Sequence, residues 1–184
     1  TIRISFVKGV TGTIQDTNWK AQADTAVTWG AKESRSEVQL LTNRILIRVE
    51  KANGAVQFLS RDGKKLLTEN PSEPRLLLDS QTWNFFAWDK NERLKSKGVL
   101  ADDFMDLSTK ARYISFGQKK LRMPLVLSNK GYAIGVAAGS TVLFCNVRTY
   151  GQYIYTQGTG QIDYYFIYDE NQERNIEQYR NLQV

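Results

Sequence analysis

The chain has 184 residues, 41% of them hydrophobic and 24% charged, with 25 Lys and Arg against 19 Asp and Glu, which is the composition of one globular domain. It contains no histidine and one cysteine, Cys145. These counts exclude Ser-His-Asp and Cys-His catalysis, histidine-ligated or multi-cysteine metal sites and an intrachain disulfide. Any chemistry must rest on carboxylates, Lys, Arg, Tyr or Ser, and we expect no metal and no cofactor.

Short runs rich in Val, Ile, Thr, Tyr and Phe, with period-two alternation, dominate the chain and predict β-strands. The predicted strands lie at residues 2–6, 37–41, 45–50, 56–60, 65–67, 75–78, 83–87, 111–116, 125–128, 132–136, 141–145 and 162–168. Asn53-Gly54 and Asp62-Gly63 supply the positive-φ positions that tight hairpins need, and residues 129–131 and 138–140 predict two further reversals. With no helical segment between them, these strands favour a mostly β fold, an antiparallel two-sheet sandwich.

The C-terminus is the exception to this pattern. Asp169 can cap a helix that has Gln172 three positions on, and Ile176, Tyr179 and Leu182 recur at helical spacing. We expect this helix to dock on the sandwich by that stripe. The chain stops at Val184 directly after it, and it begins at Thr1 with neither an initiator Met nor a signal segment. The sequence therefore resembles an excised or processed fragment, read as a single domain over residues 1–184.

The net charge of +6 raises nucleic acid or an anionic surface as a partner. From Asp89 to Arg122, however, nine basic residues are interleaved with five acidic ones, which is more typical of a solvated surface than of a phosphate track. No stretch approaches 18 consecutive apolar residues. We expect no nucleic-acid partner and no membrane insertion.

Paired carboxylates are the acid/base device that this composition permits most readily. Asp102, Asp103 and Asp106 form the densest cluster, with Glu92 nearby in sequence, and a solvated loop is the competing interpretation. Lys119-Lys120 with Arg122 could bind phosphate, although a basic strand edge that discourages edge-to-edge pairing explains them better. The short stretch 158–160 is a hairpin turn and not a phosphate loop, because a strand follows it.

Aromatic residues make up 11% of the chain. Rings on a sheet face can form a platform for sugars, and ordinary packing inside a sandwich is the alternative. The alternation in residues 162–168 favours a strand buried on both faces. The candidates are Trp83, Phe85, Tyr150, Tyr153, Tyr155, Tyr164, Tyr165 and Tyr168.

Residues 42–67, 123–134 and 160–182 carry three motifs that, in this chain order, resemble those of glycoside hydrolase family 31, the α-glucosidases and α-xylosidases. Residues 123–134, MPLVLSNKGYAI, are similar to that family's P-fLlS-kGYGi segment. Residues 160–168, GQIDYYFIY, followed by Ile176, Tyr179 and Leu182, are similar to its g-iDYYfi strand and the helix after it. Residues 42–67, with an Asp-Gly-Lys turn, are similar to its early strands. The resemblance covers residues 26–184.

The resemblance implies an N-terminal β-supersandwich similar to galactose mutarotase, followed by a (β/α)₈ barrel that carries both catalytic Asp residues and is absent from this chain. The chain itself would be non-catalytic, and the whole enzyme would hydrolyse α-glycosides through a covalent intermediate. Its implied partners are its own catalytic barrel and an α-linked oligosaccharide substrate. Mutarotase activity is not expected, because that chemistry uses histidine and the chain has none.

In this family a loop of the sandwich domain helps to shape the substrate pocket, and by order it corresponds here to residues 97–121. The resemblance makes Asp102, Asp103 and Asp106 the candidate substrate-binding residues, with no catalytic residue in the chain. Residues 92–98, ERLKSKG, stand where E-lyGlGe is usual and keep one of its two glycines.

Two alternatives remain open. An autonomous carbohydrate-binding module would use exposed Trp or Tyr and bind sugar without a barrel. A nucleic-acid-binding protein would show a steep salt dependence of affinity. The sequence leaves the sugar, the linkage and the compartment open, with the periplasm or the extracellular space favoured over the cytoplasm.

Overall fold

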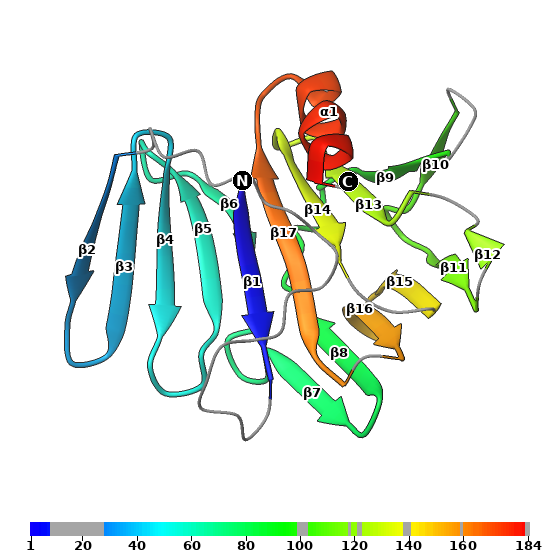
Figure 1. Ribbon diagram of the computed structural model, residues 1–184, viewed down its shortest axis with the longest axis horizontal. Helices are drawn as coiled ribbons and strands as arrows, with labels where there is room; N and C mark the ends of the chain where they lie inside the picture. Colours follow the sequence, from blue (N-terminus) through cyan, green and yellow to red (C-terminus); the bar gives the residue numbers. More distant parts are fainter. Residues whose placement is uncertain are drawn as a thin grey trace.

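The computed structural model describes residues 1–7, 28–98, 103–117, 119–120, 123–137, 141–158 and 160–182. These residues form seventeen strands and one helix, and every strand pairing between them is antiparallel. The predicted mostly β sandwich with a C-terminal helix is therefore confirmed, and backbone hydrogen bonds divide it into three sheets (Figure 1). In the described part of the chain no helix is long and apolar enough to span a bilayer.

The first sheet, called here the N-terminal sheet, is a five-stranded meander in chain order. Its strands are β2 (Trp29–Glu33), β3 (Glu37–Thr42), β4 (Ile45–Glu50), β5 (Val56–Ser60) and β6 (Lys65–Thr68). Gly54 and Gly63 have φ of 72° and 87°, so the two predicted tight turns are confirmed. The strand β2 was not predicted.

The second sheet carries the helix on its outer side and is called the helix-backed sheet. In spatial order its strands are β1 (Ile2–Phe6), β17 (Ile162–Tyr168), β14 (Tyr132–Val136), β13 (Leu125–Ser128), β9 (Leu94–Lys97) and β10 (Phe104–Asp106). The strand β1, the first of the chain, pairs with β17, the last, so segments from both ends of the chain form one edge of this sheet (Figure 1).

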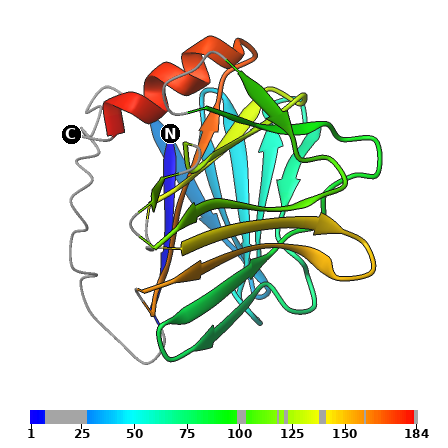
Figure 2. The same cartoon turned by 90° about the vertical axis from the view of Figure 1, so that its right-hand side faces the viewer.

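The third sheet is called the aromatic sheet for the rings on its outward side. In spatial order its strands are β12 (Lys119–Lys120), β11 (Ala111–Phe116), β15 (Thr141–Val147), β16 (Gly151–Gln157), β8 (Gln81–Phe85) and β7 (Arg75–Leu78). Figure 2 shows its strands running across those of the other two sheets, as in a sandwich. The strands β9, β10, β12 and β16 were not predicted, and the predicted reversal at 138–140 lies outside the described residues.

One hydrophobic core joins all three sheets. The rings of Phe58 in β5 and Phe166 in β17 stack with centroids 3.9 Å apart, which connects the N-terminal and helix-backed sheets. Trp88 lies between Phe86 and Phe144, at 4.9 and 5.0 Å, and connects this core to the aromatic sheet. Because these side chains are all buried, their removal from water is the main favourable term in folding.

The helix α1 (Gln172–Leu182) docks on the helix-backed sheet as predicted, through buried Ile176, Tyr179 and Leu182. Its N-cap differs from the prediction. The carboxamide oxygen of Asn171 accepts the N–H of Glu173 at 2.9 Å, whereas Asp169 accepts the N–H of Asn171 at 3.0 Å. Asn171 is therefore the N-cap, and Asp169 holds the turn before it.

Candidate functional site

The predicted substrate-binding aspartates lie around the hairpin of β9 and β10. In this hairpin Phe104 pairs with Lys97, and Asp106 with Lys95. The hairpin forms one edge of the helix-backed sheet and projects from the body of the molecule (Figure 1). Asp102 lies outside the described residues, whereas Asp103 and Asp106 are described and both are exposed. The strand β10 thus exposes to solvent part of the loop 97–121, which the family resemblance associates with the substrate pocket.

Asp106 is committed to the turn that follows β10. Its carboxylate accepts the Ser108 hydroxyl at 2.7 Å and the Ser108 N–H at 3.1 Å, and it lies 3.5 Å from the Lys110 ammonium. The hydrogen bonds from Ser108 lower the pKa of Asp106 below its ordinary value. Asp106 is thus an ionised acceptor with a local structural role.

Phe104 gives the hairpin an exposed aromatic ring with cations beside it. The Lys95 ammonium lies 3.9 Å from the ring centroid and the Lys97 ammonium 5.1 Å from it. The Phe104 side chain remains 39% exposed, while the next residue, Met105, packs against the core. A partly exposed ring with ammonium donors over its face is a chemistry suited to a polyhydroxylated ligand, which offers both C–H groups and hydroxyl acceptors.

Glu92, which is near the aspartates in sequence, lies in the protein interior. It accepts hydrogen bonds from the hydroxyls of Ser128, at 2.6 Å, and Tyr132, and its other oxygen lies 2.9 Å from the Lys130 ammonium. All three partners belong to the segment 123–134 that carries the family resemblance. The polar residues of that motif therefore hold Glu92 through hydrogen bonds and an ion pair. Because Glu92 lies two residues before β9, these contacts fix the position where the hairpin begins.

A second buried carboxylate, Glu69, lies where the three sheets meet. It accepts hydrogen bonds from the Tyr164 hydroxyl at 2.9 Å, the Asn84 amide at 3.2 Å and the Val56 N–H at 2.8 Å. The Arg75 guanidinium lies 2.5 Å away. Burial raises the pKa of Glu69, and Arg75 opposes that shift. Sequence analysis missed this centre, because its five residues come from five separate segments.

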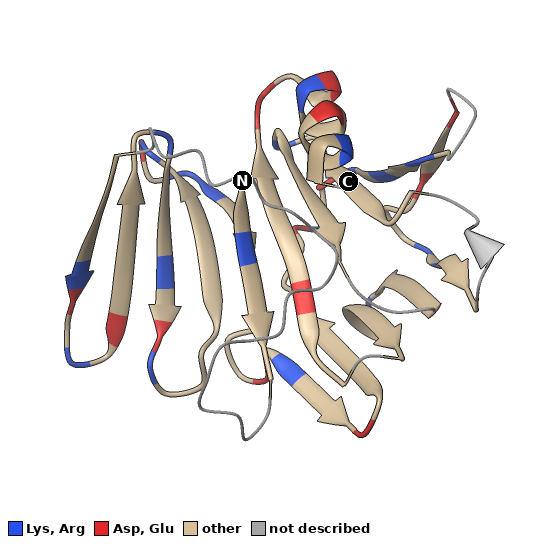
Figure 3. Ribbon diagram, viewed as in Figure 1, with Lys and Arg blue, Asp and Glu red and all other residues tan. Residues whose placement is uncertain are grey.

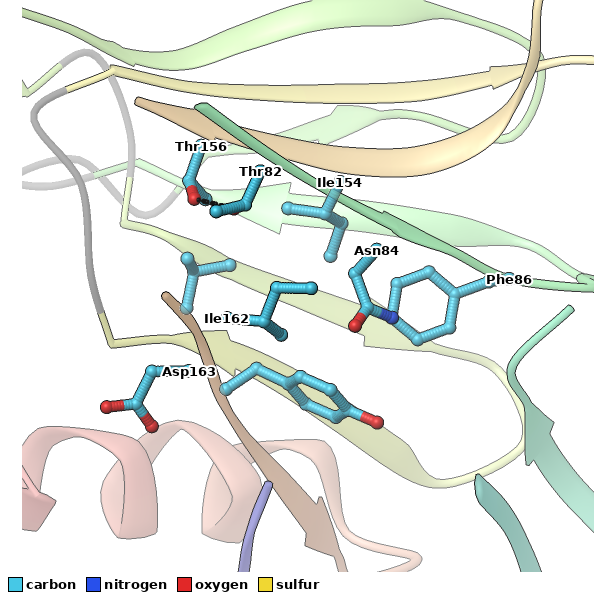
Figure 4. Close-up of a pocket in the computed structure, with 9 residues that line it drawn as sticks. Thr82, Asn84, Phe86, Ile154, Thr156, Ile162 and Asp163 are labelled. Atoms are coloured by element: carbon cyan, nitrogen blue, oxygen red, sulfur yellow. Dashed lines mark hydrogen bonds between the residues drawn. The ribbon is translucent and has the colours of Figure 1, made fainter. Parts of the chain in front are cut away.

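A small cavity lies between the aromatic and helix-backed sheets, and Asn84 and Tyr164, two hydrogen-bond partners of Glu69, line it (Figure 4). Its volume is about 20 Å³, enough for a water molecule but far below the roughly 300 Å³ at which ligand pockets begin. The hydroxyls of Thr82 and Thr156 lie 2.6 Å apart on its wall. The cavity is a packing feature and is too small for a sugar.

Six of the eight predicted aromatic residues divide into two groups, whereas Tyr150 is 77% exposed and Tyr168 is partly buried against the core. Tyr164 and Tyr165 are buried, the first in the central core and the second under α1, so packing explains both. Trp83, Phe85, Tyr153 and Tyr155 are half-buried on the outward side of the aromatic sheet, where Trp83 meets Tyr155 at 4.9 Å between centroids. Tyr113, on the same side, was missed because its neighbours in the sheet follow only from strand register.

The basic pair Lys119-Lys120 forms β12, the edge strand of the aromatic sheet, and Arg122 lies outside the described residues. An edge position agrees with the interpretation of these lysines as a guard against edge pairing. Figure 3 shows basic and acidic positions interspersed over the ribbon, with red beside blue on several strands.

No family model matches the sequence, and no curated protein matches it either. Solved structures of family GH31 enzymes do share its fold. A soil-metagenome α-xylosidase, solved with xylose, aligns with a TM-score of 0.74 at 18% identity, over 98% of this chain and 30% of that one. A Flavobacterium johnsoniae dextranase, solved with isomaltotriose, aligns at 0.71 and 19% identity, over 84% of this chain and 20% of that one.

A third similar structure is the cycloalternan-forming enzyme of Listeria monocytogenes, solved with a pentasaccharide substrate. It aligns with a TM-score of 0.70 at 16% identity, over 83% of this chain and 16% of that one. The chain thus spans between about a sixth and a third of the length of these three proteins. At such identities the likeness shows the fold, which is that of one portion of these larger enzymes.

Proposed function

We propose that this chain is the N-terminal, non-catalytic β-sandwich domain of a GH31-type α-glycosidase, spanning residues 1–184 and packing on a catalytic barrel that follows it. The observation that carries the proposal is the alignment over 98% of this chain with 30% of an α-xylosidase. Three motifs of that family, in the family's order, support it. One of them, residues 123–134, has a concrete structural role here in holding Glu92.

The described carboxylates favour a non-catalytic role. Glycoside hydrolysis uses two carboxyl groups about 5 to 10 Å apart on either side of a bound sugar, in an open pocket. Glu69 and Glu92 are each closed in by several hydrogen-bond donors, and Asp106 is engaged by Ser108. The two catalytic carboxylates would come from the barrel.

We further propose that the hairpin of β9 and β10 faces the substrate pocket of the whole enzyme and contributes to it. Phe104 and Lys95 give it an exposed ring and an ammonium donor. Asp106 braces the turn behind them, and Glu92 braces the base of β9. The substrate class is an α-linked oligosaccharide, in keeping with the sugars bound in the similar enzymes.

The test is enzymatic. The polypeptide that the gene encodes is assayed against α-glucosides, α-xylosides and α-1,6-linked glucose oligomers, beside the chain of residues 1–184. We expect hydrolysis with retained anomeric configuration by the longer polypeptide and none by residues 1–184 alone. A gene that ends at Val184, or a longer product inactive on every α-glycoside, would contradict the proposal.

A carbohydrate-binding module is the second candidate, and the half-buried pair of Trp83 and Tyr155 on a sheet face is the observation that favours it. Such a module binds sugar without a barrel. Calorimetric titration of residues 1–184 with malto- and xylo-oligosaccharides distinguishes the two functions, since only a module releases measurable heat. Substituting Trp83 by Ala should abolish that heat if the sheet face is the binding platform.

A further inference from the structure

The outward side of the aromatic sheet carries a continuous row of large apolar side chains across five strands. Strand register aligns the row from β7 through β8, β16 and β15 to β11. Its members, in that order, are Leu76, Trp83, Tyr155, Leu143 and Tyr113. The alternate positions, such as Asn84, Ile154 and Phe144, point into the core. The row therefore faces away from the sandwich.

A second row beside it is also uncharged. Phe85 pairs with Tyr153, with ring centroids 5.8 Å apart, and Tyr153 pairs with Cys145. In β7, β8, β15 and β16 no outward residue carries a charge, and Figure 3 draws β8, β15 and β16 without a blue or red position. We call this surface the aromatic face; its members are Leu76, Leu78, Trp83, Phe85, Tyr113, Leu143, Tyr153 and Tyr155.

Several of these side chains remain in contact with water. Leu78 is 53% exposed and Tyr113 is 46% exposed. Phe116, at the end of β11, is 61% exposed and meets the Tyr113 ring edge-on at 5.4 Å. Figure 2 places this sheet at the front of the molecule. A contiguous exposed apolar patch of this kind marks an interaction site in a soluble protein.

The outward sides of the other two sheets show that the aromatic face is a distinct feature. On the helix-backed sheet, α1 covers the outward side of β13, β14 and β17. On the N-terminal sheet the matching five-strand row is polar or charged, although Leu41, Leu46 and Leu59 lie beside it. That polar row, from β2 to β6, reads Lys32, Gln39, Arg48, Gln57 and Thr68. The two sheets have similar backbone geometry, but the row on the aromatic sheet is apolar and the matching row on the N-terminal sheet is polar or charged.

The composition of the aromatic face fits a protein surface better than a sugar. Interface cores are enriched in aromatic side chains and depleted of charge, and they accept aliphatic side chains freely. Leu76, Leu78 and Leu143 have no planar face for a pyranose ring, and sugar platforms place polar groups beside their rings. The five strands that carry the face, about 4.8 Å apart and about six residues long, cover roughly 450 to 500 Å². That is the size of one side of an interface between domains of one chain.

We infer that the aromatic face is where a further folded domain of the same polypeptide packs, through an uncharged surface. The inference rests on the proposed function and names the surface that this function requires. The similar solved proteins supply the reason for this occupant, because this fold takes up only 16 to 30% of their chains. The remaining polypeptide in such a protein is large enough to bury the face.

Thiol labelling tests the inference. Cys145, the one cysteine in residues 1–184, is buried and is replaced by Ser, as is every cysteine elsewhere in the full product. Leu78→Cys and Tyr113→Cys then place single thiols on the aromatic face, and Lys32→Cys places the matched control on the polar row. Each is labelled with a maleimide in the full gene product and in residues 1–184. In the full product we expect the two face thiols to react at least about tenfold more slowly than the control. In residues 1–184 we expect all three to react at similar rates.

Every other outcome overturns the inference. Equal rates in the full product mean that the face is solvated. Slow labelling in residues 1–184 that quickens on dilution means that a second copy covers it, and slow labelling that needs added oligosaccharide means a sugar platform. Glycosidase activity of the same samples separates the two proposals. Fast labelling with activity present contradicts the docking face alone, and slow labelling without activity contradicts the proposed function alone.

Discussion

Carboxylates occupy two contrasting settings in this molecule. Glu69 and Glu92 lie at closed junctions where several donors from different strands satisfy them, whereas Asp103 and Asp106 lie on an exposed edge hairpin. A buried ionisable group is often the first suspect for catalysis. Here the buried pair connects sheets and motifs, and the exposed hairpin is the part that we propose contacts a ligand. The contrast predicts that substitutions in the two settings affect different properties.

The largest expected effect follows from removing the carboxylate at the three-sheet junction. Glu69→Ala leaves the buried Arg75 guanidinium and the Tyr164 hydroxyl without their acceptor. We expect the free energy of unfolding, measured by urea denaturation, to fall by about 3 to 5 kcal/mol. Glu33→Ala is the control, because Glu33 pairs with Lys51 at the surface, and it should leave the free energy of unfolding nearly unchanged. If Glu69→Ala lowered the free energy of unfolding as little as Glu33→Ala, that result would contradict the view that Glu69 connects the three sheets.

A smaller loss is expected where the helix meets its sheet. A Cβ at Gly135 would lie 2.7 Å from the Tyr179 ring, so Gly135→Ala must shift that buried ring, which is part of the contact between α1 and the sheet. We expect a loss of about 1 to 3 kcal/mol in the same urea experiment. Gly30→Ala is the matched control, since no atom lies within 4 Å of the added carbon there, and it should be close to neutral. A neutral Gly135→Ala would show that the helix does not pack tightly at this point.

In the hairpin we expect function to change and stability to hold. Phe104→Ala removes a 39% exposed ring, so the free energy of unfolding should shift by less than about 0.5 kcal/mol. In the full gene product the same substitution should raise KM for an α-linked oligosaccharide about threefold, because a ring that contacts the substrate is lost. Tyr150→Ala, at another exposed ring, is the control. An unchanged KM would remove the hairpin from the substrate pocket.

The smallest expected effect is a pH dependence at Asp106. Ser108 holds the pKa of Asp106 below its ordinary value of 3.8, so the ionised form adds stability above that pH and the contribution is lost as the pH falls below it. Asp106→Asn should therefore be slightly less stable than the unmodified chain at about pH 6 and closer to it at about pH 3. A stability difference independent of pH would mean that the carboxylate is not the ionised acceptor.

The sequence predicted the local structure well where turn chemistry or periodicity is strong. Asn53-Gly54 produced its hairpin, and the helical stripe of Ile176, Tyr179 and Leu182 is buried as expected. The strands that were missed lack those signals. Lys95 and Lys97 make β9 polar although it pairs on both sides, and in β16 Tyr153 and Tyr155 alternate with Ile154 and Thr156, a pattern that also fits a sugar platform.

The sites were harder to predict because they depend on long-range pairing. Glu69 and Arg75 are six positions apart, but Tyr164, its other partner, is 95 positions away, and no local pattern connects them. The aspartates drew attention by proximity in sequence, although Asp106 serves a turn. The row through Trp83 and Leu143 exists only because strand register aligns five strands.

One measurement tests the central claim most directly. The polypeptide that follows residue 184 in the gene product is prepared separately, and its hydrolysis of an α-glycoside is measured before and after adding the chain of residues 1–184. The account predicts low activity from the remainder alone, none from residues 1–184 alone, and a clear gain when the two are combined. Full activity of the remainder without its partner, or hydrolysis by residues 1–184 alone, would contradict it.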